Sequence, residues 1–313
     1  MTATFPATPI QIRNLTKTYP NGYKALNGVN LDIPMGMFGL LGPNGAGKSS
    51  LMRTIATLQE ADPDGTIQWG DINMLEEKVL VRQVLGYLPQ YFGVYPGVSA
   101  VKLLDHFASL KGITNGKERK EVVNHLLHQV NLYDARDRAV SGFSGGMRQR
   151  FGIAQALLGD PRLVIVDEPT AGLDPAERVR FLNLLSEISE RAAIILSTHI
   201  VEDVSELCPQ MAILIDGAIH ATGQPTGLMQ QLSGKVWRIQ LKRDQLPTYE
   251  DKYQVLFTRF FMGDIIARIY SETDPGEGFE SVEPNLEDVY FCVMKKVGSL
   301  QSMTPAALSS PVR

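Results

Sequence analysis

The chain has 313 residues, 44% of them hydrophobic, and a formal net charge of −4 at pH 7. A chain of this length is expected to form about two domains and to bury a sizeable core. The slightly acidic balance argues against nucleic acid as the main partner, because phosphate backbones call for a basic face.

Neither a secreted nor a membrane-spanning protein is expected. Cys208 and Cys292 are far apart and lack metal-ligand spacing, which is typical of ordinary thiols in a reducing cytosol. Met1–Pro9 has no apolar core that could serve as a signal peptide. No apolar run approaches the ~18–20 residues that a spanning helix needs.

The N-terminal part is predicted to form strands followed by a phosphate loop. We expect strands at Ile10–Leu15, Val29–Ile33 and Met37–Leu41, the last an apolar run typical of a buried parallel strand. Gly42–Ser49 then fits the pattern G-x-x-x-x-G-K-[ST]. Because Ser50–Leu58 has apolar residues at helical spacing, the motif lies between a strand and a helix, as phosphate binding requires.

The residue types of this loop match the chemistry of phosphate binding. Its glycines allow a tight turn in which N–H groups point at phosphate oxygens, at the positive end of the following helix. Lys48 is expected to reach the β- and γ-phosphates, and the Ser49 hydroxyl to ligate Mg²⁺. The residues expected to contact the nucleotide here are Gly42, Pro43, Asn44, Gly45, Ala46, Gly47, Lys48, Ser49 and Ser50.

A helical insertion is predicted after two further strands, one at Gly65–Trp69 and one ending within Leu85–Gln90. From residue 91 to about 146 the sequence has helical periodicity, at Ala100–Leu110 and Lys117–Val130, and no strand-like run. The pattern therefore indicates an α/β fold interrupted by helices.

The α/β pattern then resumes with a helix at Met147–Leu158. Leu163–Val166 and Ala193–Leu196 are predicted as buried strands separated by a helix, which makes a βαβ unit. Met211–Asp216 and Ala218–Ala221 are predicted as a hairpin that turns at an Asp-Gly pair.

The chain is expected to divide into a first domain, 1–232, and a small C-terminal domain, 235–297. The second contains alternating polar and apolar residues, a strand at Ile265–Tyr270 and a closing helix at Asn285–Met294. The tail 298–313, rich in Ser, Pro and Ala, is expected to be disordered.

Four polar groups outside the loop are candidate site residues. Asp167 and Glu168 end a buried strand, so Asp167 can hold Mg²⁺ and Glu168 can polarise the attacking water; an acidic pair can also simply cap the next element. Ser144–Gly146 opens a helix with an anion-binding turn, yet Ser-Gly-Gly is also a generic cap. Gln90 and His199 each follow a strand and, taken alone, fit ordinary loop residues.

In this order and spacing, these motifs resemble the ATP-binding cassette (ABC) ATPase family. The resemblance covers roughly Ile10 to Leu232 and includes Tyr19 as the aromatic adenine platform. It implies an α/β fold, a P-loop NTPase cassette of the ABC type with a helical insertion, here joined to a small α+β C-terminal domain.

The resemblance also assigns roles within one nucleotide site. Tyr19 would stack on adenine, and Gln90 would sense Mg²⁺ and the γ-phosphate. Glu168 would act as general base, His199 would contact the γ-phosphate, and Lys48 completes the catalytic group. The expected Mg²⁺ ligands are Ser49, Gln90 and Asp167.

The resemblance further implies a head-to-tail pair of cassettes that holds ATP between them. Each site would take Ser144, Gly145 and Gly146 from a second copy of the chain or a homologous cassette. Asp174 would communicate across the pair, although Asp174-Pro175-Ala176-Glu177 is also a well-formed helix start.

One departure from the family pattern bears on function. The usual Leu-Ser-Gly-Gly-Gln signature is Phe143-Ser144-Gly145-Gly146-Met147 here, which is similar to cassettes that power ABC-2-type exporters. We therefore expect an ATPase subunit at the cytoplasmic face of the membrane, bound to a permease on a separate chain. The helical insertion and the segment Tyr91, Phe92, Val94 and Tyr95 are expected to form the docking groove.

Other interpretations carry less weight. A soluble ABC ATPase acting on nucleic acid or ribosomes usually has paired cassettes, long coiled coils or zinc cysteines, which this sequence lacks. A module that holds ATP without turnover is disfavoured by intact Lys48, Asp167, Glu168 and His199. His125 and His128 lie three apart on a predicted helix, but without an evident third ligand they favour a solvated face.

Overall fold

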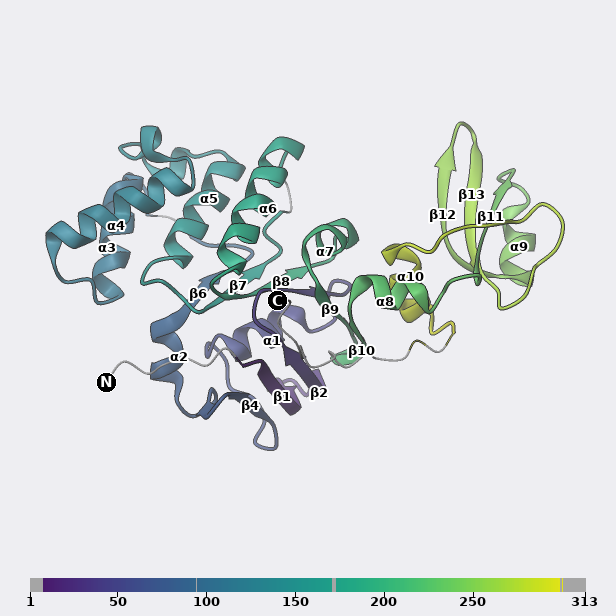
Figure 1. Cartoon of the computed structure of the whole chain (residues 1–313), viewed down its shortest axis with the longest axis horizontal. Helices are drawn as coiled ribbons and strands as arrows, with labels where there is room; N and C mark the ends of the chain where they lie inside the picture. The colour runs from purple at the N-terminus through teal and green to yellow at the C-terminus, as the bar shows by residue number, and fades with distance from the viewer. Residues whose placement is uncertain (1–7, 94, 171–172, 299, 301–313) are drawn as a thin grey trace, which may run out of the picture.

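The computed structural model describes residues 8–93, 95–170, 173–298 and 300. The molecule is elongated, with helices α3 and α4 at one end of the long axis and the C-terminal sheet at the other (Figure 1). Val94, Ala171, Gly172 and most of the tail 298–313 lie outside the described residues. No helix of the described ranges has the length and apolar character needed to cross a bilayer.

The central sheet has six strands in the order β10-β9-β3-β8-β7-β6. Neighbouring strands pair in parallel from β9 to β6, and β10 is antiparallel to β9. The strands are β3 Met37–Leu41, β6 Leu85–Leu88, β7 Leu163–Asp167, β8 Ala193–Thr198, β9 Gln210–Ile215 and β10 Ala218–Gly223. Because parallel strands end at one edge, the residues that follow β3, β6, β7 and β8 are brought together there.

Alternate residues of this sheet pack into two different cores. Phe38, Leu40 and Ile165 face helix α1 (Lys48–Ile55) and an antiparallel sheet of order β2-β1-β4-β5. That sheet consists of β1 Ile10–Thr18, β2 Lys24–Ile33, β4 Thr66–Trp69 and β5 Ile72–Asn73. Val164 and Leu196 contribute to the opposite core, which is covered by helices. Burial on both faces explains why these strands are continuous apolar runs.

The helical side of the core is built from the predicted insertion and the helices after it. They are α3 Ala100–Leu110, α4 Gly116–Gln129, α5 Gly145–Ala156, α6 Pro175–Ser189, α7 Val201–Leu207 and α8 Pro225–Gln230, with short 3₁₀ turns at Tyr133–Ala135 and Val140–Gly142. Helix α2 (Lys78–Val84) precedes the insertion, and its Val81 packs into the other core. The helix predicted at Ala100–Leu110 is confirmed at both ends.

The C-terminal segment forms a third sheet of order β12-β13-β11-β14. Its elements are β11 Val236–Leu241, α9 Leu246–Lys252, β12 Gln254–Phe261, β13 Asp264–Tyr270 and β14 Glu280–Ser281. Helix α10 (Leu286–Lys295) leaves this sheet and packs against α7 and α8, so that Val289 and Cys292 belong to the same buried cluster as Val204 of α7. Asn285 caps α10 in a capping box with Asp288.

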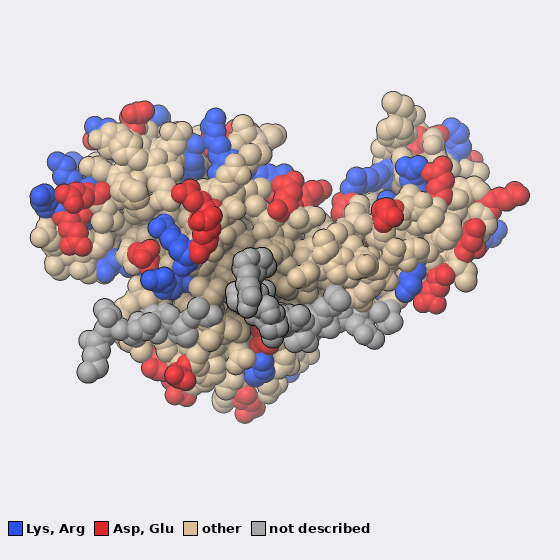
Figure 2. Space-filling view, viewed as in Figure 1, with Lys and Arg blue, Asp and Glu red and all other residues tan. Residues whose placement is uncertain are grey.

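Charges of both signs are interspersed over the helical part and the C-terminal sheet on the face shown in Figure 2. This mixture agrees with a net charge of −4.

Candidate nucleotide site

The loop predicted to cradle phosphates joins β3 to α1. Two of its glycines lie where other strands come close: a Cβ at Gly42 would be 2.3 Å from the Leu214 carbonyl oxygen, and one at Gly47 would be 2.4 Å from that of Ala25. Gly47 also has φ 104, in the left-handed region that favours glycine. A side chain at either position would collide with a neighbouring strand, so this tight turn requires glycine at both.

Lys48 is buried, with 4% of its surface exposed. Its Nζ donates hydrogen bonds of 2.7 Å to the Gly42 carbonyl and 3.2 Å to the Pro43 carbonyl. Burial lowers the pKa of the Lys48 ammonium, an effect that the nearby Glu168 and Asp167 carboxylates oppose. The Lys48 ammonium is therefore bonded to loop carbonyls and lies near two acidic groups.

Glu168 is the residue on which the predicted catalytic side chains converge. Its Oε1 lies 3.4 Å from Nζ of Lys48 and 3.3 Å from Nδ1 of His199. Its Oε2 accepts a hydrogen bond of 2.8 Å from Nε2 of Gln90. The Glu168 backbone has φ 48, and its N–H donates 2.8 Å to the Ser197 carbonyl on β8. Three side chains, from the phosphate loop and from the segments after β6 and β8, thus meet the carboxylate that follows β7.

Asp167, one residue earlier, is 3% exposed. Its Oδ1 is buried and has no hydrogen-bond partner among the described residues. Burial, with the Asp167 charge as a second cause, raises the pKa of the Tyr87 phenol. An acidic oxygen that is buried without a donor is costly unless it meets a cation.

A cavity of about 410 Å³ opens over the loop. It is lined by Tyr23, Ala25, Pro43, Asn44, Gly45, Gly47, Lys48, Ser49, Ser50, Gln90 and Glu168. Most of the residues predicted to contact nucleotide therefore surround one hollow. Tyr23 was not predicted as a residue of this site. Its hydroxyl donates a hydrogen bond of 3.2 Å to the Gly45 carbonyl.

Tyr19 lies beside this cavity but does not line it. Its hydroxyl is 3.1 Å from the Ser50 hydroxyl and donates 2.9 Å to Oε1 of Gln59. Tyr19 is half-buried, whereas 53% of Tyr23 is exposed. The Tyr23 hydroxyl is therefore bonded to the middle of the loop and the Tyr19 hydroxyl to the start of α1.

The Ser-Gly-Gly turn lies outside the lining of the cavity. Ser144 caps α5, its Oγ accepting a hydrogen bond of 3.2 Å from the Met147 N–H. Ser144 and Gly145 are exposed, and a Cβ at Gly145 would meet no atom within 4 Å. Asp174 caps α6 as predicted, accepting 2.8 Å from the Glu177 N–H. The turn thus presents its open side to solvent.

His125 and His128 line a hollow with Gln129, Glu187, Glu190 and Arg191. His128 stacks on Tyr133, with ring centroids 3.7 Å apart. Within the described ranges, no three or more His, Cys, Asp or Glu residues have metal-binding geometry.

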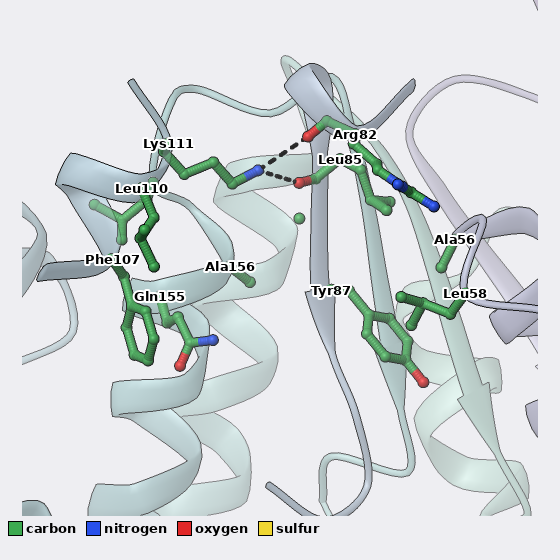
Figure 3. A pocket seen from close by; sticks show the side chains of 12 residues that line it. Ala56, Leu58, Arg82, Leu85, Tyr87, Phe107, Leu110, Lys111, Gln155 and Ala156 are labelled. Atoms are coloured by element: carbon green, nitrogen blue, oxygen red, sulfur yellow. Dashed lines mark hydrogen bonds between the residues drawn. The ribbon is translucent and has the colours of Figure 1, made fainter. Parts of the chain in front are cut away.

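A further hollow of about 390 Å³ lies between the cassette core and the helical insertion. Its lining is Ala56, Leu58, Arg82, Leu85, Gly86, Tyr87, Phe107, Leu110, Lys111, Gln155, Ala156 and Leu158 (Figure 3). Leu58 and Leu110 are 60% and 71% exposed. Nζ of Lys111 donates 2.7 Å to the Leu85 carbonyl, and burial lowers the pKa of Lys111. The hollow is mostly apolar, with two cationic residues, Arg82 and Lys111, in its lining.

The segment after Gln90 does not contribute to this hollow. Tyr91 and Tyr95 are 84% and 61% exposed, and Phe92 packs against the helical core near Gly152. Val94 lies outside the described residues.

The sequence matches a family model described as ABC transporter over residues 26–171. An uncharacterised ABC transporter ATP-binding protein of Bacillus subtilis, YxlF, is 32% identical over 91% of this chain and 99% of its own length. The linearmycin resistance ATP-binding protein LnrL of the same organism is 34% identical over 72% of each chain. The daunorubicin/doxorubicin resistance ATP-binding protein DrrA of Streptomyces peucetius is 30% identical over 87% of this chain and 80% of its own.

Solved structures match the cassette part. A dimeric ATP-binding cassette in a post-hydrolysis state, bound to ADP and Pi, is 25% identical with a TM-score of 0.63, covering 69% of this chain and 98% of that one. An ATP-binding subunit of an ABC transporter is 27% identical with a TM-score of 0.63, covering 72% and 93%. On these similarities, the chain belongs to the ABC transporter family, among its ATP-binding subunits.

Proposed function

We propose that this chain hydrolyses ATP to drive export through a permease on a separate chain. The observation that carries the proposal is the convergence of Lys48, Gln90 and His199 on Glu168, above a phosphate loop, in a member of the ABC transporter family. Similarity to a cassette captured with ADP and Pi supports turnover rather than ATP storage.

Each of these side chains has a separate role in ATP hydrolysis. Glu168 is the general base that takes a proton from the attacking water, and Gln90 and His199 orient its carboxylate. Lys48 exchanges the loop carbonyls for β- and γ-phosphate oxygens when ATP binds. His199, 43% exposed, is free to contact the γ-phosphate.

The chain also offers a fit for Mg²⁺. The buried Oδ1 of Asp167, which lacks a partner among the described residues, is a suitable ligand, with Ser49 and Gln90 contributing oxygens nearby. When bound, Mg²⁺ supplies positive charge that offsets the charge of the phosphates.

We further propose that two cassettes pair head to tail. Ser144 and Gly145 are exposed, Gly146 is half-buried, and all three lie outside the lining of their own cavity, so the open side of this turn is available to the ATP bound by a partner cassette. Similar cassettes form dimers in solved structures. Residues 1–232 act as this cassette, and 235–297 as an accessory domain.

The apolar hollow of Figure 3 is proposed as the docking site of the permease. It exposes Leu58 and Leu110 between the phosphate-loop helix and the insertion, so that a seated helix would touch both parts of the cassette. This docking would hold the chain at the cytoplasmic face of the membrane. The names of DrrA and LnrL, both resistance proteins, support export as the direction.

A native pull-down from detergent-solubilised cells tests the assignment. The wild-type chain is expected to co-purify with a polytopic membrane protein in near-equal amount. The double variant Leu58→Glu/Leu110→Glu is expected to lose that protein and keep basal ATPase activity. Val79→Glu, at a site that is 69% exposed and outside the hollow, is the control and should keep it. Recovery of ribosomes or a soluble complex would contradict the transporter role.

A further inference from the structure

Asp203 is a fully buried carboxylate on α7, four residues after His199 and outside the nucleotide cavity. Its Oδ2 accepts a hydrogen bond of 2.6 Å from Oγ1 of Thr170. Its Oδ1 accepts one of 2.7 Å from Nε of Arg178, whose Nη2 also lies 2.7 Å away. Oγ1 of Thr198 is 3.5 Å from Oδ2. The sequence pattern alone did not single out any of these residues.

Each partner belongs to a segment that carries a proposed functional residue. Thr170 follows Glu168 by two positions, and Thr198 directly precedes His199. Arg178 lies in the first turn of α6, which Asp174 caps. One carboxylate therefore connects the turns after β7 and β8 with the start of α6.

These turns need such a connection because their backbone is not held by regular structure. Glu168 has φ 48, a conformation that costs free energy for a residue with a side chain and persists only where surrounding contacts determine it. The Glu168–His199 distance of 3.3 Å depends on both turns at once. Oγ1 of Thr198 also stabilises the second turn, because it accepts a hydrogen bond of 3.0 Å from the Ile200 N–H.

We propose that Asp203 is a positioning residue for ATP hydrolysis, which holds the turns bearing Glu168 and His199 in register with the start of α6. The inference rests on the roles proposed above for Glu168 and His199. Asp203 touches no residue of the phosphate loop in this network, so it acts on turnover and not on nucleotide binding.

The chain offers a matched control for a buried carboxylate. Asp288 is also 0% exposed and accepts a hydrogen bond of 2.7 Å from Nε of Arg268, but it joins the start of α10 to β13. Asp203→Asn and Asp288→Asn are both expected to lower the midpoint of thermal unfolding, because each removes the buried charge that pairs with a half-buried arginine. Only Asp203→Asn is expected to lower kcat, by roughly tenfold, and the KM for ATP should stay unchanged. The reason is that small displacements of catalytic groups slow the chemical step.

A second pair of variants serves if Asp203→Asn does not fold. Thr170→Val keeps the shape of the side chain and removes the donor to Asp203, whereas Thr170→Ser keeps the donor. Steady-state ATPase assays well below the unfolding midpoint are expected to show a lower kcat for Val, wild-type kcat for Ser, and unchanged affinity for fluorescent ATP in both. Wild-type kcat in Thr170→Val, or equal losses in the Asp203 and Asp288 variants, would overturn the proposal.

The failure of the inference can be told apart from the failure of the proposed function. Glu168→Gln, assayed alongside, reports on the general base alone. If Glu168→Gln abolishes turnover while Thr170→Val keeps the wild-type kcat, the role of Glu168 as general base is supported and the role of Asp203 is rejected. If Glu168→Gln turns over normally, the proposed role of Glu168 is rejected instead, together with the register that Asp203 is said to maintain.

Discussion

Gln90 and Glu168 are 78 residues apart in sequence, yet Nε2 of Gln90 donates a hydrogen bond of 2.8 Å to Oε2 of Glu168. The bond links the second residue after β6, just before the helical insertion begins, to the residue directly after β7. If the proposed roles hold, a movement of the insertion relative to the sheet is expected to reach the proposed general base through this hydrogen bond.

The first prediction concerns Glu168. Glu168→Gln keeps the size of the side chain and its contact with Gln90, but cannot take a proton. ATP binding should persist, while hydrolysis should slow by roughly 10²–10⁴, the usual weight of a general base. Equilibrium binding of a fluorescent ATP analogue and a phosphate-release assay measure the two effects. Near-normal phosphate release would remove Glu168 from this role.

A second prediction tests the sandwich of two cassettes. Ser144→Arg places a cation where the partner's ATP would lie and should abolish ATP-dependent dimers without weakening nucleotide binding to the monomer. Each variant is made in a chain that also carries Glu168→Gln, and static light scattering with and without ATP measures the fraction of dimers. Ser144→Thr is the control, because threonine also caps helices and keeps a hydroxyl at this exposed site. Persistent dimers in Ser144→Arg would rule out the head-to-tail arrangement.

The third prediction separates two aromatic residues. If Tyr19 stacks on adenine as proposed, Tyr19→Ala should weaken ATP binding by about tenfold, since stacking a base on an aromatic ring is worth roughly 1–3 kcal/mol. Tyr19→Phe removes the hydroxyl contacts to Ser50 and Gln59 but keeps the ring, and should bind normally. Titration with a fluorescent ATP analogue measures both. A large loss in Tyr23→Ala with none in Tyr19→Ala would assign the stacking ring to Tyr23, which lines the cavity.

The residues of this site that could be predicted are those that belong to short sequence motifs. The phosphate loop and the Asp174 cap are short motifs whose residue types are set by backbone geometry, so Gly47 and Asp174 could be interpreted directly. The Thr170–Asp203 bond joins residues 33 apart, and no spacing rule marks it. Tyr23 was missed for a related reason, because its place depends on how the turn after β1 folds over Gly45.

The C-terminal segment shows the same division. The strand predicted at Ile265–Tyr270 is present as β13, which is buried at alternate positions. Strand β12 was not predicted, because exposed residues run together along Thr258–Phe261 at the hairpin tip. A helix was predicted at Asn285–Met294 and is present as α10, but its packing on α7 and α8 follows from tertiary contacts that the local sequence does not encode.

The last prediction concerns the two cysteines and alkaline pH. Burial raises the pKa of the Cys208 and Cys292 thiols from 9.0 to about 12 in the folded state. Since the folded pKa lies above the unfolded value, the contribution to stability is complete below pH 9 and is lost as pH rises toward 12. Each thiol should lower the free energy of unfolding by up to about 1.4 kcal/mol per pH unit in that window. Urea unfolding between pH 8 and 10.5 should therefore show a shallower pH dependence in Cys208→Ala/Cys292→Ala than in the wild type; equal slopes would contradict burial of the thiols as its cause.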